Sequence, residues 1–126
     1  MKNQNLIDRT KDFAHRCVKL ALSLSNTKLG LHIQGQLIRC STSVAANYRA
    51  ANLAQTKPSF IAKISIVLEE ADESAFWLEF IIDEKLLEKE RVDDLLKEAK
   101  ELTAIFVSSR KTAQQNLKKE SLLTNH

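Results

Sequence analysis

Four acidic side chains close together in the chain come nearest to a catalytic or metal-binding pattern. They are Glu69, Glu70, Asp72 and Glu73. Carboxylates in a helical bundle hold metal ions when Glu-x-x-His pairs on two helices complete the ligand set. Those pairs are missing, and the histidines lie far from the acids in sequence: His15, His32 and His126. We therefore expect neither a metal ion nor a cofactor, and we interpret the four acids as a solvated face.

Acid–base catalysis by the same carboxylates lacks the motifs that accompany it in common enzyme classes. The sequence contains no glycine-rich turn, nucleophile elbow or phosphate loop, and only two glycines occur in 126 residues. The sequence therefore predicts a protein that is not an enzyme. An enzyme acting on a small molecule is the function we rank last, because it would require a polar pocket with perturbed acids inside the fold.

Basic side chains form the second group that could carry a function, because the segment from Phe13 through Leu68 contains no acidic residue. The candidates for nucleic-acid binding are Lys11, Arg16, Lys19, Arg39, Arg49, Lys57 and Lys63. Such a surface would contact phosphates of RNA or DNA without sequence preference. Base-specific stacking is not predicted, since Tyr48 and Trp77 fall at helical positions that we expect to be buried.

Charge is divided unevenly along the chain. Residues 1–63 contain ten basic and two acidic residues, for a net charge of +8, whereas residues 64–109 contain five basic and thirteen acidic residues, for −8. Residues 110–126 add +3. This asymmetry can direct nucleic acid or a second copy to one face, and it also suits two antiparallel helix pairs that attract each other.

The elements that position these groups are expected to be helices throughout. Glycine and proline are scarce, and apolar residues recur every three or four positions. The pattern predicts one domain over residues 1–126 with helices at about 5–25, 31–55, 58–83 and 88–117, followed by a frayed tail from about 119. Short connections predict an all-α, up-down-up-down antiparallel four-helix bundle with packing angles of about 20°.

Several local signals refine this expectation. Pro58 disfavours helix at Lys57 but suits the first turn of a new helix, so the boundary falls at Thr56 or Lys57.

Cys17 and Cys40 lie at apolar helical positions and are expected to be buried free thiols. The sequence shows neither a membrane span nor the apolar core of a signal peptide, which predicts a cytoplasmic protein.

The second and third predicted helices carry a family resemblance. The run SVAAN at residues 43–47 follows Ser41, and Phe60-Ile61, Ile64-Ser65-Ile66, Glu73 and Leu78 come after it. This pattern resembles the four-helix bundle proteins encoded in intervening sequences of bacterial 23S rRNA genes, often labelled ribosomal-protein-like. The resemblance implies a ring-like homo-oligomer, a pentamer in known relatives, with no established enzymatic activity. The family is also similar to small basic bundle proteins that accompany reverse transcriptases of diversity-generating elements.

The chain departs from the commonest family pattern after the asparagine, where Ala50 and Ala51 replace Glu-Gly. The departure suggests a differently placed ion pair between the second and third helices, from Arg49 to the acids Glu69-Glu70. Asn47 and Glu73 match the family pattern, and we expect them to form, with Glu70, a structural polar core whose buried hydrogen bond fixes helix register.

Two functions therefore remain open. The leading one is a non-enzymatic, oligomeric assembly or interaction module. The alternative is a sequence-independent RNA or DNA binder, an accessory to a nucleic-acid enzyme such as a reverse transcriptase. The binder needs its basic residues on one exposed, continuous face, whereas the module allows acids between Glu69 and Asp94 to neutralise them.

Overall fold

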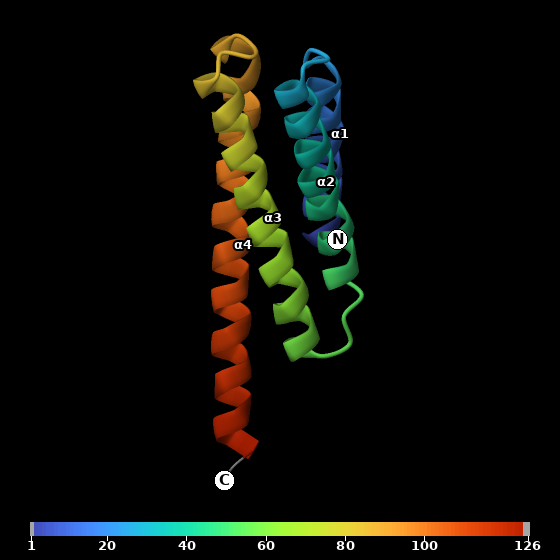
Figure 1. The fold of residues 1–126 in the computed structure, drawn as a ribbon. Helices are drawn as coiled ribbons and strands as arrows, with labels where there is room; N and C mark the ends of the chain where they lie inside the picture. Colours follow the sequence, from blue (N-terminus) through green and yellow to red (C-terminus); the bar gives the residue numbers. More distant parts are fainter. Residues whose placement is uncertain (1, 125–126) are drawn as a thin grey trace.

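Four α-helices make up the computed structural model, which describes residues 2–124 (Figure 1). They are α1 (Lys2–Leu22), α2 (Lys28–Ala51), α3 (Lys57–Asp83) and α4 (Lys89–Thr124). Residues 2–124 contain no strand, and consecutive helices run in opposite directions. The predicted all-α four-helix bundle is therefore confirmed.

Threonine side chains start two of the helices. Thr27 Oγ1 accepts a hydrogen bond from the Gly30 amide at 3.0 Å, and Thr56 Oγ1 accepts one from the Ser59 amide at 3.1 Å. Pro58 lies in the first turn of α3, as predicted. Gly30, expected before the second helix, lies inside its first turn, where a Cβ atom would run into the Ser25 carbonyl oxygen. Glycine fits there because it has no Cβ atom to clash with this oxygen, and not because the backbone adopts a left-handed angle.

The turn after α3 has a left-handed residue that is not glycine. Lys85 has a φ angle of 55°, and its amide donates to the Ile82 carbonyl at 3.0 Å. The Leu86 amide donates to the Ile81 carbonyl, also at 3.0 Å. Together these bonds satisfy carbonyl groups that the end of a helix leaves unpaired.

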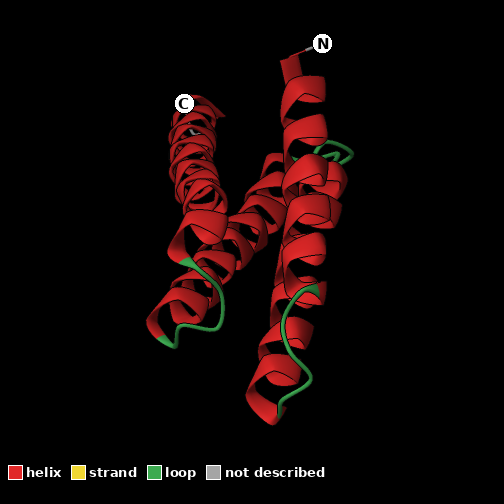
Figure 2. Ribbon diagram, turned by 90° about the horizontal axis from the view of Figure 1, so that it is seen from above, coloured by secondary structure: helices red, strands yellow, loops and turns green. Residues whose placement is uncertain are grey.

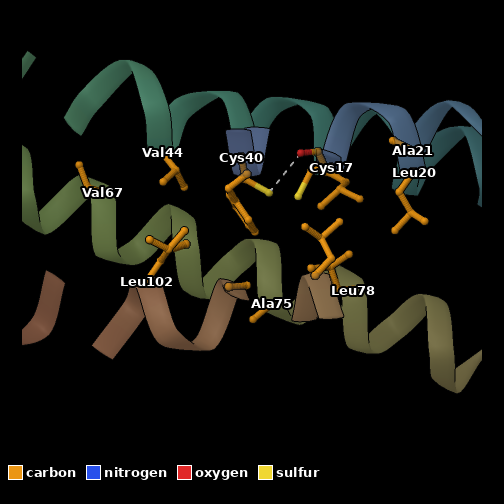
Figure 3. Packing of buried hydrophobic residues seen from close by; sticks show 14 of the residues in the cluster. Cys17, Leu20, Ala21, Cys40, Val44, Val67, Ala75, Leu78 and Leu102 are labelled. Carbon is orange, nitrogen blue, oxygen red and sulfur yellow. Dashed lines mark hydrogen bonds between the residues drawn. The ribbon is translucent and has the colours of Figure 1, made fainter. Parts of the chain in front are cut away.

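Apolar side chains from all four helices form one buried core. Its largest completely buried members include Phe13, Leu37, Leu78 and Phe106. Figure 3 shows the two cysteines among aliphatic neighbours. Among the described residues, every buried side-chain nitrogen and oxygen atom has a hydrogen-bond partner.

Both cysteines are free and buried, as the sequence predicted. Burial raises the pKa of the Cys17 thiol far above its ordinary value and raises that of Cys40 to about 11. The Ser74 hydroxyl lies 3.2 Å from Cys40 Sγ. Burial of both thiols thus disfavours the thiolate, which is the reactive form, in the folded chain.

Consecutive helices pack along much of their length, whereas α1 and α4 meet over a short stretch. Viewed from above, α3 crosses between the α1/α2 pair and α4 (Figure 2). The bundle is therefore two helical hairpins joined mainly through α2 and α3.

The fourth helix is longer than the sequence indicated. We predicted an end near residue 117 and a frayed tail from about 119, but α4 continues to Thr124 and passes the start of α3 (Figure 1). Lys57 forms an ion pair with Glu120, which ties the extra turns to α3. Leu117 also continues the apolar stripe of α4 as a half-buried residue, so the tail retains a packing face.

Candidate assembly surface

An open groove of about 860 Å³ runs along the outer side of the α1/α2 hairpin. Small residues of α2, among them Ala45 and Ala46, leave room between the two helices. The apolar part of the lining also includes Ile7, Ala14, Val18 and Leu53. Leu53 is 75% exposed, so the groove presents apolar surface to solvent. We call it the α1/α2 groove.

The rim of the α1/α2 groove is mainly basic. Lys11 and His15 contribute from α1, and Arg49 contributes from α2. Asp8 is the acidic member of the lining, and its carboxylate accepts a hydrogen bond from the Gln4 amide at 3.0 Å. Within residues 4–124, Lys11 and Arg49 have no carboxylate within salt-bridge distance. The groove thus combines an apolar floor with unpaired positive charge.

A ridge on α3 has the opposite charge. Its residues Ala62, Ile66, Glu69 and Phe76 are exposed and follow helical spacing, and we call them the α3 ridge. Phe76 is 52% exposed, and its ring contacts Trp77 edge-on with 4.9 Å between centroids. The α3 ridge therefore presents the ring of Phe76, which contacts Trp77, and the aliphatic side chain of Ile66, with the Glu69 carboxylate between them along the helix.

An ion-pair cluster joins α2 to α3 beside this ridge. Arg39 Nη1 donates to Glu70 Oε2 at 3.1 Å, and Nη2 donates to Glu73 Oε2. The Trp77 indole donates to the same Glu73 oxygen at 3.2 Å. The expected pair between the second and third helices is present, but its arginine is Arg39, not Arg49.

The predicted buried bond between Asn47 and Glu73 was wrong. Asn47 Nδ2 donates within α2, to the Ser43 carbonyl at 3.0 Å and to Ser43 Oγ at 2.8 Å. With Arg39 beside Glu70 and Glu73, the antiparallel register places Asn47 about eight residues, or roughly 12 Å along α3, from Glu73. Asn47, Glu70 and Glu73 are partly exposed rather than buried.

A second cluster, which the sequence analysis missed, closes α1 onto α4. Arg9 Nε and Nη2 donate to both oxygens of Glu98, at 2.8 and 2.6 Å, and Nη2 also donates to Glu101 at 3.0 Å. These hydrogen bonds hold the pKa of the Glu98 carboxyl below its ordinary value. The signal in sequence was the pair of acids three positions apart, which share one helix face.

The basic candidates do not gather on one face. Lys11 and Arg49 line the α1/α2 groove, while Arg16 and Lys19 line a separate hollow of about 320 Å³ with Arg91. Arg39 and Lys57 are ion-paired. Lys63 is a partly buried residue of α3.

The acidic residues likewise show no metal-site arrangement. In the described part of the chain, no three His, Cys, Asp or Glu residues group closely enough to hold a metal ion. No helix within residues 2–124 is long and apolar enough to span a bilayer.

The chain matches a known protein family over most of its length. The model of the 23S rRNA-intervening sequence protein family matches residues 2–108. The chain belongs to this family. The resemblance seen in the SVAAN run is therefore confirmed. No curated protein is similar to the chain.

A solved structure shares the fold of this 23S rRNA-intervening sequence family member. It is a protein with unknown function from the S23 ribosomal protein family of Bacteroides thetaiotaomicron, 32% identical in sequence, with a TM-score of 0.80. The match covers 88% of this chain and 99% of the other. The family match ends at Ser108, so the last 16 described residues of α4 lie outside it.

Proposed function

We propose that the protein is a non-enzymatic assembly module, a homo-oligomer in which the α3 ridge of one copy occupies the α1/α2 groove of the next. The observation that carries this proposal is complementarity. The groove has an apolar floor and a rim with unpaired Lys11 and Arg49, and the ridge presents Ile66 and Phe76 around Glu69. The positive charge of the groove rim complements the negative charge of the ridge, and both surfaces expose apolar side chains.

A contact between two different surfaces allows either a closed ring or an open filament. Groove and ridge lie on different helices of the same chain, so the contact is heterologous and every copy carries one of each surface. Heterologous contacts make rings when the rotation between copies closes. A ring of five subunits is the size that the family resemblance implies.

Phe76 is the residue expected to contribute most to this contact. Exposed aromatic rings that enter a pocket at the centre of an interface are typical hot spots. Complete burial of a phenylalanine side chain is worth about 1.5–3 kcal/mol, and Phe76 begins 52% exposed. The contacts of Phe76 with Trp77 and Phe80 limit the entropy lost when the ring is immobilised.

A charge exchange tests the proposal, with molar mass measured by light scattering after size exclusion. Glu69→Lys places positive charge against the basic rim, and Arg49→Glu places negative charge against the ridge. Either change should reduce the wild-type oligomer to smaller species at low salt. The double variant should restore it, because the charges are again opposite.

Glu84→Lys is the matched control, since it makes the same charge change at an exposed position just after α3. It should leave the oligomer unchanged. A wild-type monomer, or a double variant no larger than the single variants, would contradict the proposed contact. Circular dichroism of each variant confirms that the helices are retained.

Sequence-independent nucleic-acid binding is the second candidate function. The observation that favours it is a group of three basic residues that line one hollow: Arg16, Lys19 and Arg91. The same hollow contains one acidic residue, Asp94. An accessory protein of a reverse transcriptase would need such a phosphate-binding surface. Salt-sensitive co-elution of the protein with a mixed-sequence RNA tests this function, and loss of co-elution in Arg16→Gln with Lys19→Gln would locate it.

A further inference from the structure

The end of α4 forms a projecting segment that the family match does not include. We call residues 109–124 the C-terminal arm. All 16 residues are helical, so the arm is about 24 Å long. The arm runs beside the start of α3 and continues past it (Figure 1). Its solvent-facing side is therefore open to a partner.

Charge on the C-terminal arm is almost entirely positive. Its basic residues are Arg110, Lys111, Lys118 and Lys119. Glu120 is the only acidic residue after Glu101 in the sequence, and it is paired with Lys57. Within residues 4–124, none of the four basic side chains has a carboxylate within salt-bridge distance. The arm therefore carries four uncompensated positive charges.

The arm directs most of this charge away from the bundle. Ala113 and Leu117 are half-buried and continue the core stripe of α4, whereas Lys111, Lys118 and Lys119 are exposed. Lys111 and Lys118 are seven residues apart, so they project from the same side of the helix, about 10.5 Å from each other along its axis. The helix therefore holds the backbone positions of these two lysines at a set spacing.

The chemistry of the arm selects one kind of partner. Aromatic side chains, which stack on the bases of single strands, are absent from residues 109–124. The exposed apolar residues of the arm are Leu122 and Leu123 at its tip, too few for the broad apolar face of a membrane-surface helix. Cations that are spaced along a helix without stacking groups match the regular phosphates of a duplex.

We propose that the C-terminal arm binds the phosphate backbone of duplex nucleic acid without sequence preference. One arm makes a weak contact. If the ring proposed above forms, rotation about its axis places every arm at the same end, and the contacts add through multivalency. Only this gain in affinity rests on the proposed assembly.

The test removes the charge of the arm in the full-length protein. Arg110, Lys111, Lys118 and Lys119 are all changed to Gln, which keeps helix propensity, and binding to a short fluorescent DNA duplex is measured by anisotropy between low and moderate salt. The dependence of log K on log salt should become shallower by about 3 to 4, because each lost phosphate contact removes about 0.9. A control variant removes four exposed basic residues that belong to none of the surfaces named above: Lys28, Lys85, Lys97 and Lys100.

The control should keep most of the wild-type salt dependence. Equal loss in both variants would overturn the proposal, because net charge alone would then explain binding. Failure of the wild type to bind the duplex, or binding only to phosphatidylserine vesicles, would overturn it as well. Molar mass measured in parallel separates the two proposals: a monomer that binds through the arm contradicts only the assembly, and an oligomer without duplex affinity contradicts only the arm.

Discussion

Replacement of Arg9 by methionine should loosen the seam between α1 and α4. Methionine keeps much of the length of the side chain and removes three hydrogen bonds, two to Glu98 and one to Glu101. Exposed ion pairs contribute about 0.2–1 kcal/mol, and hydrogen bonds with charged groups contribute more when they are bidentate. Glu98 is only 16% exposed, whereas Arg9 is 35% exposed and partly screened. We expect a loss of about 1–1.5 kcal/mol in the free energy of unfolding.

A double-mutant cycle isolates this interaction from the other effects of the substitutions. Urea unfolding of Arg9→Met, Glu98→Gln and the double variant, followed by circular dichroism at one protein concentration, gives the coupling energy. We expect about 1 kcal/mol. A coupling below about 0.3 kcal/mol would show that solvent screens the pair and that apolar packing alone closes the seam.

The same pair predicts how stability depends on pH. Arg9 holds the pKa of Glu98 in the folded state below the ordinary value of 4.5, so the unfolded chain takes up the proton first as pH falls. The contribution to stability is complete above that value and is lost as pH falls through the folded-state pKa. The wild type should therefore lose more stability than Arg9→Met between pH 6 and pH 3, and parallel losses would contradict this assignment.

Three further predictions concern the turns and the core. Gly30→Ala should destabilise the fold by 1 kcal/mol or more, since its Cβ meets a loop carbonyl, while Gly35→Ala, with open space around it, should stabilise it by up to about 1 kcal/mol; urea unfolding measures both. Lys85→Gly should remove strain at a left-handed residue, which should raise the free energy of unfolding by up to about 1 kcal/mol and with it the melting temperature; a lower melting temperature would contradict the strain. Cys17 and Cys40 should react with a thiol reagent only in denaturant, and rapid labelling of the folded protein would contradict their burial.

The helices were predictable from sequence because apolar spacing and the scarcity of glycine act locally. Thr56 and Pro58 fixed the start of α3 for the same reason. The end of α4 was missed because a polar composition suggested fraying, whereas the ion pair of Glu120 with Lys57 depends on a residue 63 positions away in sequence. Helix ends that are set by distant partners leave little local signal.

The sequence indicated that charged residues of different helices would form ion pairs, but it did not indicate which residues would be partners. Opposite charges on the second and third helices indicated an ion pair, yet the choice of Arg39 over Arg49 depends on the antiparallel register, which periodicity does not fix. Asn47 was misplaced for that reason. Arg9 and Glu98 are 89 positions apart, so only the closed bundle reveals them as partners. The shape of the α1/α2 groove depends on the distance between α1 and α2, which the small residues of α2 help to set. The sequence shows these small residues but not that distance.

The order of contacts between helices also bears on how the chain folds. Each extensive contact joins neighbours in sequence, α1 with α2, α2 with α3 and α3 with α4, while the α1–α4 seam spans almost the whole chain and is short. Mean contact separation is therefore low, and helical bundles of this topology fold in microseconds to milliseconds. Because α1 and α2 precede α4 in the chain, the first hairpin can form during synthesis, whereas the bond of Arg9 with Glu98 can form only after α4 has been made. Until α4 has been synthesised, the side of α3 that packs against α4 has no partner in the chain, so a nascent chain exposes this apolar side until the second hairpin closes.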